Sequence, residues 1–290
     1  ELIGTGKLYE SHHKALRDRA ISDELILERG YATWMGAHAA LEAETRWSKG
    51  QVDPKRYPVL SYPVYKVGDA HTYVMRPDNP RTKNPKGAKP QIIKYEYPKG
   101  AGQVMDVLPS RKEALGDPTV DLWITEGVLK ADALTSTGLL AAAINGVYGW
   151  RGTNDRGGKM IIPDLEQVAW NGRRVVLAFD SDMVRNTNVM QAAKRFGVWA
   201  EGKGAKVQVL KLPQDGPKVG VDDYLASLPS EQRTLAALER HVYPLSDGTR
   251  TFTDRFGKTA DGHELLNPPG YQNRQGPLTY TNPETGRTKT

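Results

Sequence analysis

The sequence predicts an α/β protein in which a parallel sheet flanked by helices follows a smaller α+β region. Between residues 120 and 212, short apolar runs that fit strands alternate with helical patterns, which is typical of parallel sheets. Between residues 54 and 102, eight prolines exclude long helices. After residue 243, aliphatic side chains almost disappear. We therefore expect an N-terminal region over 1–115, a main α/β domain over 116–243 and a polar tail or linker over 244–290.

The composition excludes several classes of protein. With no cysteine among its 290 residues, the chain has no disulfide framework, cysteine nucleophile, iron–sulfur cluster or thiolate zinc site. No apolar run approaches the roughly 20 residues of a transmembrane helix, so we expect no membrane association. The net charge of +6 is compatible with a polyanionic partner without requiring one. Because the chain begins at Glu1 and shows no signal peptide, we expect a piece of a longer cytoplasmic protein.

The N-terminal region should begin with helices and continue as a small antiparallel sheet. Residues 12–29 have helical periodicity, with Ser22 as the N-cap of a second helix that Gly30 ends. A third helix is expected over 35–47. The β-prone segments that follow cover 59–66, 71–75 and 91–97.

A basic stretch between residues 76 and 99 holds most of the excess positive charge, with tyrosines among the cations. Cations for phosphates and aromatic rings for bases are what a groove for single-stranded nucleic acid requires. The alternative is a solvated loop with ordinary sheet tyrosines. The residues that would contact nucleic acid are Arg76, Arg81, Lys83, Lys86, Lys89, Lys94, Tyr95 and Lys99.

The main domain should contain four parallel strands joined through helices. Right-handed crossovers place the carboxyl ends of such strands on one edge of the sheet, where open parallel sheets bind ligands. The expected strands cover 120–125, 139–144, 174–179 and 206–212, and the expected helices cover 130–136, 189–201, 224–228 and 231–241.

Acidic residues fall at the ends of two of these strands. Glu126 follows the first strand, and Asp180 and Asp182 follow the third. Three carboxylates on one edge repel one another unless a cation neutralises them, and oxygen ligands suit Mg²⁺ or Mn²⁺. Asp222, after the fourth strand, is a candidate for a further metal ligand. Each acid also has a simpler interpretation, as a helix-capping or Asx-turn residue.

The motifs at these strand ends resemble the Toprim domain, which bacterial-type primases, topoisomerases and some nucleases share. The match consists of Ile124-Thr125-Glu126-Gly127, Ala143-Ile144-Asn145-Gly146-Val147 and Phe179-Asp180-Ser181-Asp182, in this order. A wider resemblance, over residues 10 to 228, is to a Toprim-like family found in primase and helicase proteins of phages and plasmids. That family, often described only as a domain of unknown function, has segments like Ala20–Glu24, the basic stretch, Lys130–Ala133 and Val221–Leu225.

The resemblance implies a role for each residue. Glu126 would act as general acid/base or lie next to the metal, and Asp180 and Asp182 would hold Mg²⁺ or Mn²⁺. Lys130, at the start of the following helix, would meet a phosphate, although an exposed surface lysine gives the same pattern. The glycine-rich segment 145–159 either closes on a nucleotide or template or is a mobile surface loop. Its cations are Arg151, Arg156 and Lys159.

We therefore predict a metal-dependent primase-type nucleotidyltransferase that makes primers on single-stranded DNA for a phage or plasmid replication protein. Its partners would be single-stranded DNA, nucleoside triphosphates and a helicase domain or helicase partner. The chain lacks the cysteine zinc module of familiar bacterial primases, so the basic stretch would have to hold the template, and it has no Walker A motif. The alternatives are a Toprim-type DNA nuclease and a non-catalytic module that binds DNA and recruits a helicase.

Overall fold

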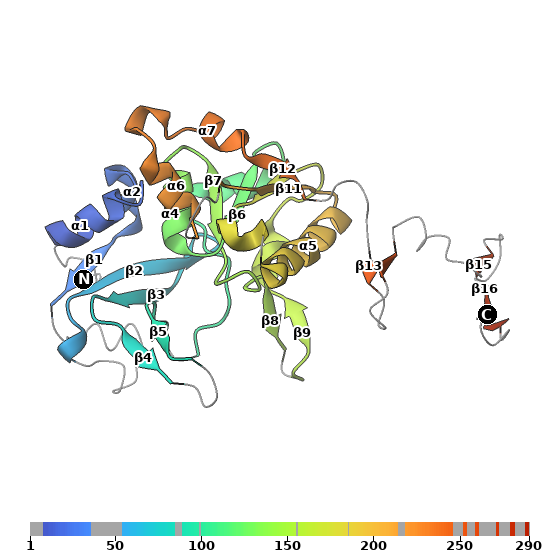
Figure 1. Ribbon diagram of the computed structural model, residues 1–290, viewed down its shortest axis with the longest axis horizontal. Coiled ribbons are helices and arrows are strands. Elements are labelled where there is room, and N and C mark those ends of the chain that lie inside the picture. The colour runs from blue at the N-terminus through green and yellow to red at the C-terminus, as the bar shows by residue number, and fades with distance from the viewer. Residues whose placement is uncertain are drawn as a thin grey trace. The chain divides into compact units, whose positions relative to one another are not determined.

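The computed structural model describes residues 8–35, 54–84, 89–98, 100–154, 156–184, 186–213 and 218–245, together with short strands beyond residue 245 (Figure 1). The chain divides into two compact units, Glu1–Leu245 and Ser246–Thr290. The predicted helix over 35–47 lies outside the described residues, apart from Met35. In the second unit, antiparallel pairings join β13 (Phe252–Thr253) to β14 (Thr259–Ala260), and β15 (Tyr271–Gln272) to β16 (Thr279–Thr281) and β17 (Thr288–Lys289).

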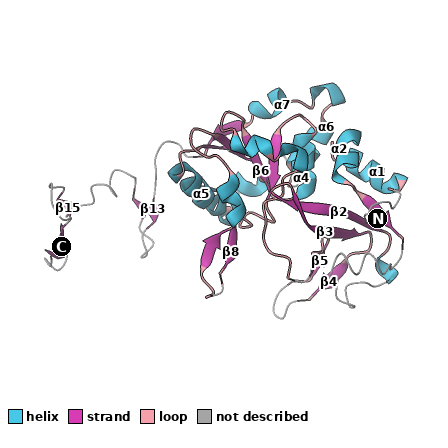
Figure 2. Ribbon diagram, turned by 180° about the vertical axis from the view of Figure 1, so that it is seen from behind, coloured by secondary structure: helices cyan, strands magenta, loops and turns pink. Residues whose placement is uncertain are grey.

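Two short helices and an antiparallel sheet form the N-terminal region (Figure 2). As predicted, Ser22 caps the second helix and Gly30 ends it. The Ser22 hydroxyl accepts a hydrogen bond from the backbone N–H of Leu25, and Gly30 has a φ of 77°. The sheet has the order β1–β2–β3, and β4 and β5 form a separate hairpin. The elements are α1 (Glu10–Arg17), α2 (Asp23–Arg29), β1 (Ala32–Trp34), β2 (Val59–Lys66), β3 (Asp69–Pro77), β4 (Arg81–Lys83) and β5 (Gln91–Ile93).

Five strands form the main sheet in the order β12–β11–β10–β6–β7. Four of them are parallel, as predicted, and β12 pairs antiparallel with β11 at one edge. The chain passes from β6 to its neighbour β7 and later adds β10 on the opposite side of β6. The carboxyl ends of β6 and β10 therefore form the switch point at which open sheets bind ligands. The strands are β6 (Leu122–Thr125), β7 (Leu140–Ala143), β10 (Arg174–Leu177), β11 (Lys206–Leu210) and β12 (Val242–Pro244).

Helices cover both faces of this sheet. Trp123 of β6 packs on one face with Leu129 of α4 (Val128–Thr135) and Leu225 of α6 (Val221–Ser227), in a core shared with α1 and α2. On the other face, Ile124 of β6 packs with Phe196 of α5 (Thr187–Gly202). Alternate residues of each strand thus enter opposite cores. No helix in the described part of the chain combines the length and apolar character that a membrane-spanning segment needs.

The predicted helix over 231–241 is interrupted. A 3₁₀ turn at Ser230–Gln232 precedes the short α7 (Leu235–Glu239). At the break, Arg233 Nε donates to the backbone carbonyl of Leu228 at 3.1 Å. Its side chain thus bonds back to the preceding segment, and Arg233 leaves the helical conformation with a ψ of 70°.

Two further elements differ from expectation. The segment 145–159 contributes to a hairpin of β8 (Arg151–Thr153) and β9 (Lys159–Ile161), whose strands of three residues are too short to show a periodic apolar pattern. Helix α6 begins at Val221 with Gly220 as its N-cap, so the two aspartates that follow lie in its first turn and not before it.

A buried charge cluster joins the N-terminal region to the main domain. Arg29, the last residue of α2, donates to both oxygens of Asp132 in α4 at 2.6 and 3.0 Å. It also donates to both oxygens of Asp106 at 2.8 and 3.0 Å. The backbone of Asp106 pairs with the ends of β2 and β7, so this residue links the two sheets. The cluster thereby fixes the N-terminal sheet against α4.

Candidate active site at the carboxyl edge of the main sheet

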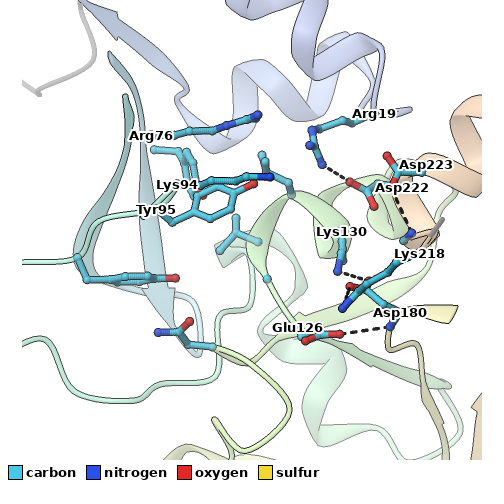
Figure 3. Close-up of a pocket in the computed structure, with 17 residues that line it drawn as sticks. Arg19, Arg76, Lys94, Tyr95, Glu126, Lys130, Asp180, Lys218, Asp222 and Asp223 are labelled. Carbon is cyan, nitrogen blue, oxygen red and sulfur yellow. Dashed lines mark hydrogen bonds and ion pairs between the residues drawn. The ribbon is translucent and has the colours of Figure 1, made fainter. Parts of the chain in front are cut away.

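A pocket of about 410 Å³ lies where the carboxyl ends of β6 and β10 face the N-terminal region (Figure 3). Its lining combines five cationic side chains with four carboxylates, which suits a polyanion accompanied by a metal cation. The cations are Arg19, Arg76, Lys94, Lys130 and Lys218, and the carboxylates are Glu126, Asp180, Asp222 and Asp223.

Glu126 follows β6 directly and lies beside Asp180, which comes after β10. Glu126 Oε1 accepts a hydrogen bond from the backbone N–H of Asp180 at 3.3 Å. Gly127, with a φ of 135°, turns the chain from Glu126 into α4, a conformation that disfavours any residue with a Cβ. Burial raises the pKa of the Glu126 carboxyl, Lys130 opposes the shift, and the Asp180 charge adds to it. The structure thus brings together these two predicted site residues.

Two ammonium groups hold the Asp180 carboxylate, which is almost fully buried. Lys130 Nζ, from the first turn of α4, pairs with Oδ1. Lys218 Nζ, from the loop before α6, lies 2.7 Å from Oδ2, and its side chain is 47% exposed. Lysine ammonium groups are point charges on flexible stems, which move more easily than an arginine fork. A divalent cation would have to compete with these two ammonium groups for Asp180.

Asp182 lies in a 3₁₀ turn, Ser181–Val184, that directly follows Asp180. Its side chain falls outside the part of the structure that is described, so its role as a metal ligand stays a prediction. Ser181 ties the turn to the loop that carries Lys218. Its backbone N–H donates to the carbonyl of Val219 at 2.9 Å, and its hydroxyl accepts from the N–H of Val219 at 2.9 Å. These bonds keep Lys218 at the pocket.

Asp222 faces the N-terminal side of the pocket. It is fully buried in α6, and its Oδ2 pairs with Arg19 from the loop between α1 and α2. Its Oδ1 has no hydrogen-bond partner among the described residues. Burial raises the pKa of Asp222, and the Arg19 charge opposes this shift. The role of Asp222 in metal binding stays a prediction. Its contact with Arg19 joins the main domain to the N-terminal region at the edge of the pocket.

The carboxylates of Asp180 and Glu126 fit a divalent cation with oxygen ligands. Among the described residues, no group of three or more His, Asp or Glu side chains converges in a way that would hold a metal ion. Mg²⁺, however, is commonly held by only one or two carboxylates, with water and substrate phosphates completing its shell. The repulsion between the adjacent carboxylates contributes to the raised pKa of Glu126, and a divalent cation relieves it.

The opposite wall comes from the predicted basic stretch. Arg76 lies on β3, Lys94 and Tyr95 follow β5, and all three line the pocket. The Arg76 guanidinium carbon is 5.7 Å from the centroid of the Tyr95 ring. Figure 3 shows these side chains across the pocket from Glu126 and Asp180.

Three further cations of the basic stretch, Arg81, Lys83 and Lys89, lie on or next to the β4–β5 hairpin, outside the lining of this pocket. Arg81 Nε donates to Glu96 Oε1 at 3.1 Å, and the same carboxylate pairs with Arg56. Lys83 and Lys89 are exposed to solvent. The two remaining predicted contacts, Lys86 and Lys99, fall outside the described residues.

Arg151, Arg156 and Lys159 lie on the β8–β9 hairpin and do not line the pocket. The Arg151 guanidinium carbon is 4.9 Å from the ring centroid of Tyr148 and 5.0 Å from that of Trp150. Arg156 and Lys159 are exposed, and Figure 1 shows the hairpin extending away from the sheet. A contact of these residues with nucleotide or template stays a prediction.

Sequence reasoning missed two residues of the site, Arg19 and Lys218. Arg19 pairs with Asp222, which lies 203 positions away, so no local sequence pattern could predict the contact. Lys218 stands three residues before α6, and its distance from Asp180 depends on the loop that returns from β11. The one available signal is the sequence Lys218-Val219-Gly220, which leads into the motif Val221–Leu225.

The chain has a primase-like α/β fold, which it shares with solved primases. The DnaG catalytic core superposes on this chain with a TM-score of 0.53 and 16% sequence identity, over 81% of this chain and 74% of that structure. The Aquifex aeolicus primase superposes with a TM-score of 0.51 and 14% sequence identity, over 81% of this chain and 56% of that one. The RNA polymerase domain of Mycobacterium tuberculosis primase DnaG superposes with a TM-score of 0.51 and 14% sequence identity, over 81% of this chain and 74% of that one. The predicted fold class is therefore confirmed.

The family match falls mostly within the main domain. Residues 112–232 match a family described as Domain of unknown function (DUF3854). An uncharacterized protein of Picosynechococcus sp. is 33% identical over 164 residues, which make up 52% of this chain and 16% of that protein. The chain thus spans a small part of this curated relative, and a little over half of the Aquifex aeolicus structure.

Proposed function

We propose that the protein is a metal-dependent nucleotidyltransferase that synthesises primers on single-stranded DNA from nucleoside triphosphates. The observation that carries this proposal is the meeting of Glu126 and Asp180 at the switch point of the sheet, across a pocket from Arg76 and Lys94. Phosphoryl transfer requires mainly positioning and electrostatic stabilisation of phosphate charge. Carboxylates for a metal on one wall and cations for phosphates on both walls supply these requirements.

Each charged residue near the carboxylates then has a task. When bound at Asp180, with Asp182 as the further predicted ligand, Mg²⁺ or Mn²⁺ supplies positive charge that neutralises the phosphates. Glu126 Oε2, the oxygen that does not accept from the Asp180 backbone, is suited to accept the proton of a 3′-hydroxyl because the pKa of this carboxyl is raised. Lys130 and Lys218, once released from Asp180, offer ammonium groups to the phosphate chain.

The template would run from the pocket along the β4–β5 hairpin. Lys83 and Lys89 are exposed there, and Lys94 continues the path to the pocket. Basic side chains that follow the backbone of a strand are a usual feature of single-strand binding. We further propose that the chain works in the cytoplasm within a phage or plasmid replication protein, together with a helicase domain or partner.

The reaction is tested by incubating the chain with single-stranded DNA, labelled nucleoside triphosphates and Mg²⁺ or Mn²⁺. We expect primer-sized products that need the metal and disappear in Asp180→Asn. The matched control is Asp121→Asn, which removes a carboxylate that pairs with Arg174 at the opposite end of β6. Shortened template in place of primers would assign the protein to the nucleases. DNA binding without any product in wild type and variants would assign it to non-catalytic, helicase-recruiting modules.

The template path is tested through the salt dependence of DNA binding. Lys83→Gln/Lys89→Gln should lower the slope of log K against log salt by about 0.7 for each DNA phosphate that the removed lysines neutralise in wild type. Lys14→Gln, which removes an exposed cation of α1, is the control and should leave the slope unchanged. An unchanged slope in the double variant would exclude the hairpin as the path of the strand.

A further inference from the structure

One wall of the pocket is aromatic. Tyr62 lies on β2, Tyr95 and Tyr97 follow β5, and all three line the pocket. Tyr62 is 3% exposed and belongs to the core, whereas Tyr95 is 37% exposed. Of the three rings on this wall, Tyr95 is therefore the most accessible to a ligand.

A cation lies against the Tyr95 ring. The Arg76 guanidinium carbon lies 5.7 Å from its centroid, a distance at which cation and ring attract each other. A ring that is already oriented loses little conformational freedom when a ligand packs on it.

The wall across from Tyr95 has a different chemistry. Lys130 and Lys218 meet at Asp180, and Figure 3 shows them separated from Tyr95 by the width of the pocket. A ligand that satisfies both walls must present an apolar, π-bearing face at one end and several negative charges at the other. A nucleotide has this division between its base and its phosphates.

We infer that Tyr95, positioned by Arg76, is the platform on which the base of a bound nucleotide stacks, with its phosphates toward Lys130 and Lys218. The inference rests on the proposed function, because it assumes that the pocket takes a nucleotide. Every base has a π-face, so stacking tolerates all four bases, and preferences follow stacking strength. The larger purine rings should therefore bind more tightly than the pyrimidines.

The test compares three probes by calorimetry on the full chain in Mg²⁺: ATP, UTP and inorganic tripolyphosphate, which has no base. Tyr95→Ala should weaken ATP binding about 5- to 150-fold, as expected for loss of one stacked base. The same change should leave tripolyphosphate binding within about two-fold and should remove the preference for ATP over UTP. Tyr95→Phe keeps the ring and should retain both the affinity and the preference.

Three outcomes would overturn the inference. In the first, Tyr95→Ala leaves the affinity for ATP unchanged; in the second, it weakens ATP and tripolyphosphate equally; in the third, it weakens ATP while the preference over UTP persists. If wild type still makes metal-dependent primers under any of these outcomes, only the base platform fails and the proposed function stands. If wild type binds none of the three probes and makes no primers, both fail together.

Discussion

Replacing Arg29 by Met tests whether the buried charge cluster holds the two walls of the pocket together. The guanidinium makes four hydrogen bonds to the carboxylates of Asp106 and Asp132. All three side chains are at most 3% exposed. Methionine keeps a similar length but removes every one of these bonds. Asp132 then keeps the Tyr31 hydroxyl at 2.6 Å as a partner, and its charge loses its counter-ion.

Removing one partner of a buried ion pair lowers the free energy of unfolding by about 3–5 kcal/mol, because the other charge stays buried without compensation. In Arg29→Met two carboxylates lose the same partner, so we expect a loss of stability in the upper part of that range. In a domain of this size each kcal/mol lowers Tm by roughly 2–4 °C, which predicts a fall of roughly 10–20 °C. The loss should be smaller at acid pH, because protonation neutralises the unpaired carboxylates.

Urea unfolding followed by circular dichroism at neutral pH measures this effect. Lys14→Met is the control, since it removes an exposed ion pair with Asp18 and should cost no more than about 0.5 kcal/mol. A triple variant, Arg29→Met with Asp106→Asn and Asp132→Asn, should recover part of the loss. If Arg29→Met stays within about 1 kcal/mol of wild type, the cluster does not hold the walls together and our argument is wrong.

Three further changes test the site and its supports. Lys218→Gln removes an ammonium group that lies 2.7 Å from Asp180 Oδ2 and competes with a cation for this carboxylate. The change should raise the affinity for Mn²⁺ about 1.4- to 5-fold in calorimetry, whereas Lys218→Arg, which keeps the charge, should leave the affinity unchanged. Gly220→Ala brings a Cβ into close contact with the buried Oδ1 of Asp222 and should lower the free energy of unfolding in urea by about 1–3 kcal/mol. Gly202→Ala, which adds a Cβ in open space, should leave it unchanged. Arg173→Lys loses the fork that bonds five backbone carbonyls and should cost at least about 2 kcal/mol in the same assay.

The main sheet was predictable because its strands are buried on both faces. Runs such as Arg174–Phe179 are continuously apolar after their first residue, and glycines and caps mark the helices between them. The β8–β9 hairpin was not predictable, since strands of three residues that carry Arg, Lys and Gly have no periodic signal. The break before α7 coincides with a bond from Arg233 to the carbonyl of Leu228, a contact that no local sequence pattern indicates.

The acidic half of the site followed from one topological rule. Carboxyl ends of parallel strands meet at one edge, and this rule alone places Glu126 and Asp180 together. The basic half needed contacts between distant parts of the chain. Arg19 reaches the pocket through α1 and α2, and Arg76 reaches it through the antiparallel sheet. Composition showed that residues 76–99 are basic, but only the packing of β2 and β3 against the main domain selects Arg76, Lys94 and Tyr95 from that stretch.

The charges of the pocket explain why metal and phosphate should depend on one another. Without a ligand, the acid at Asp180 is balanced by Lys130 and Lys218, and Asp222 is balanced by Arg19. A triphosphate alone would have to draw these cations away from their acids, and a divalent cation alone would have to displace the lysines. If both entered together at the proposed site, the metal would replace the lysines at Asp180, and the released ammonium groups would meet phosphate charge that the metal leaves unneutralised. Each ligand would then remove the electrostatic cost of binding the other, and their affinities would be coupled reciprocally.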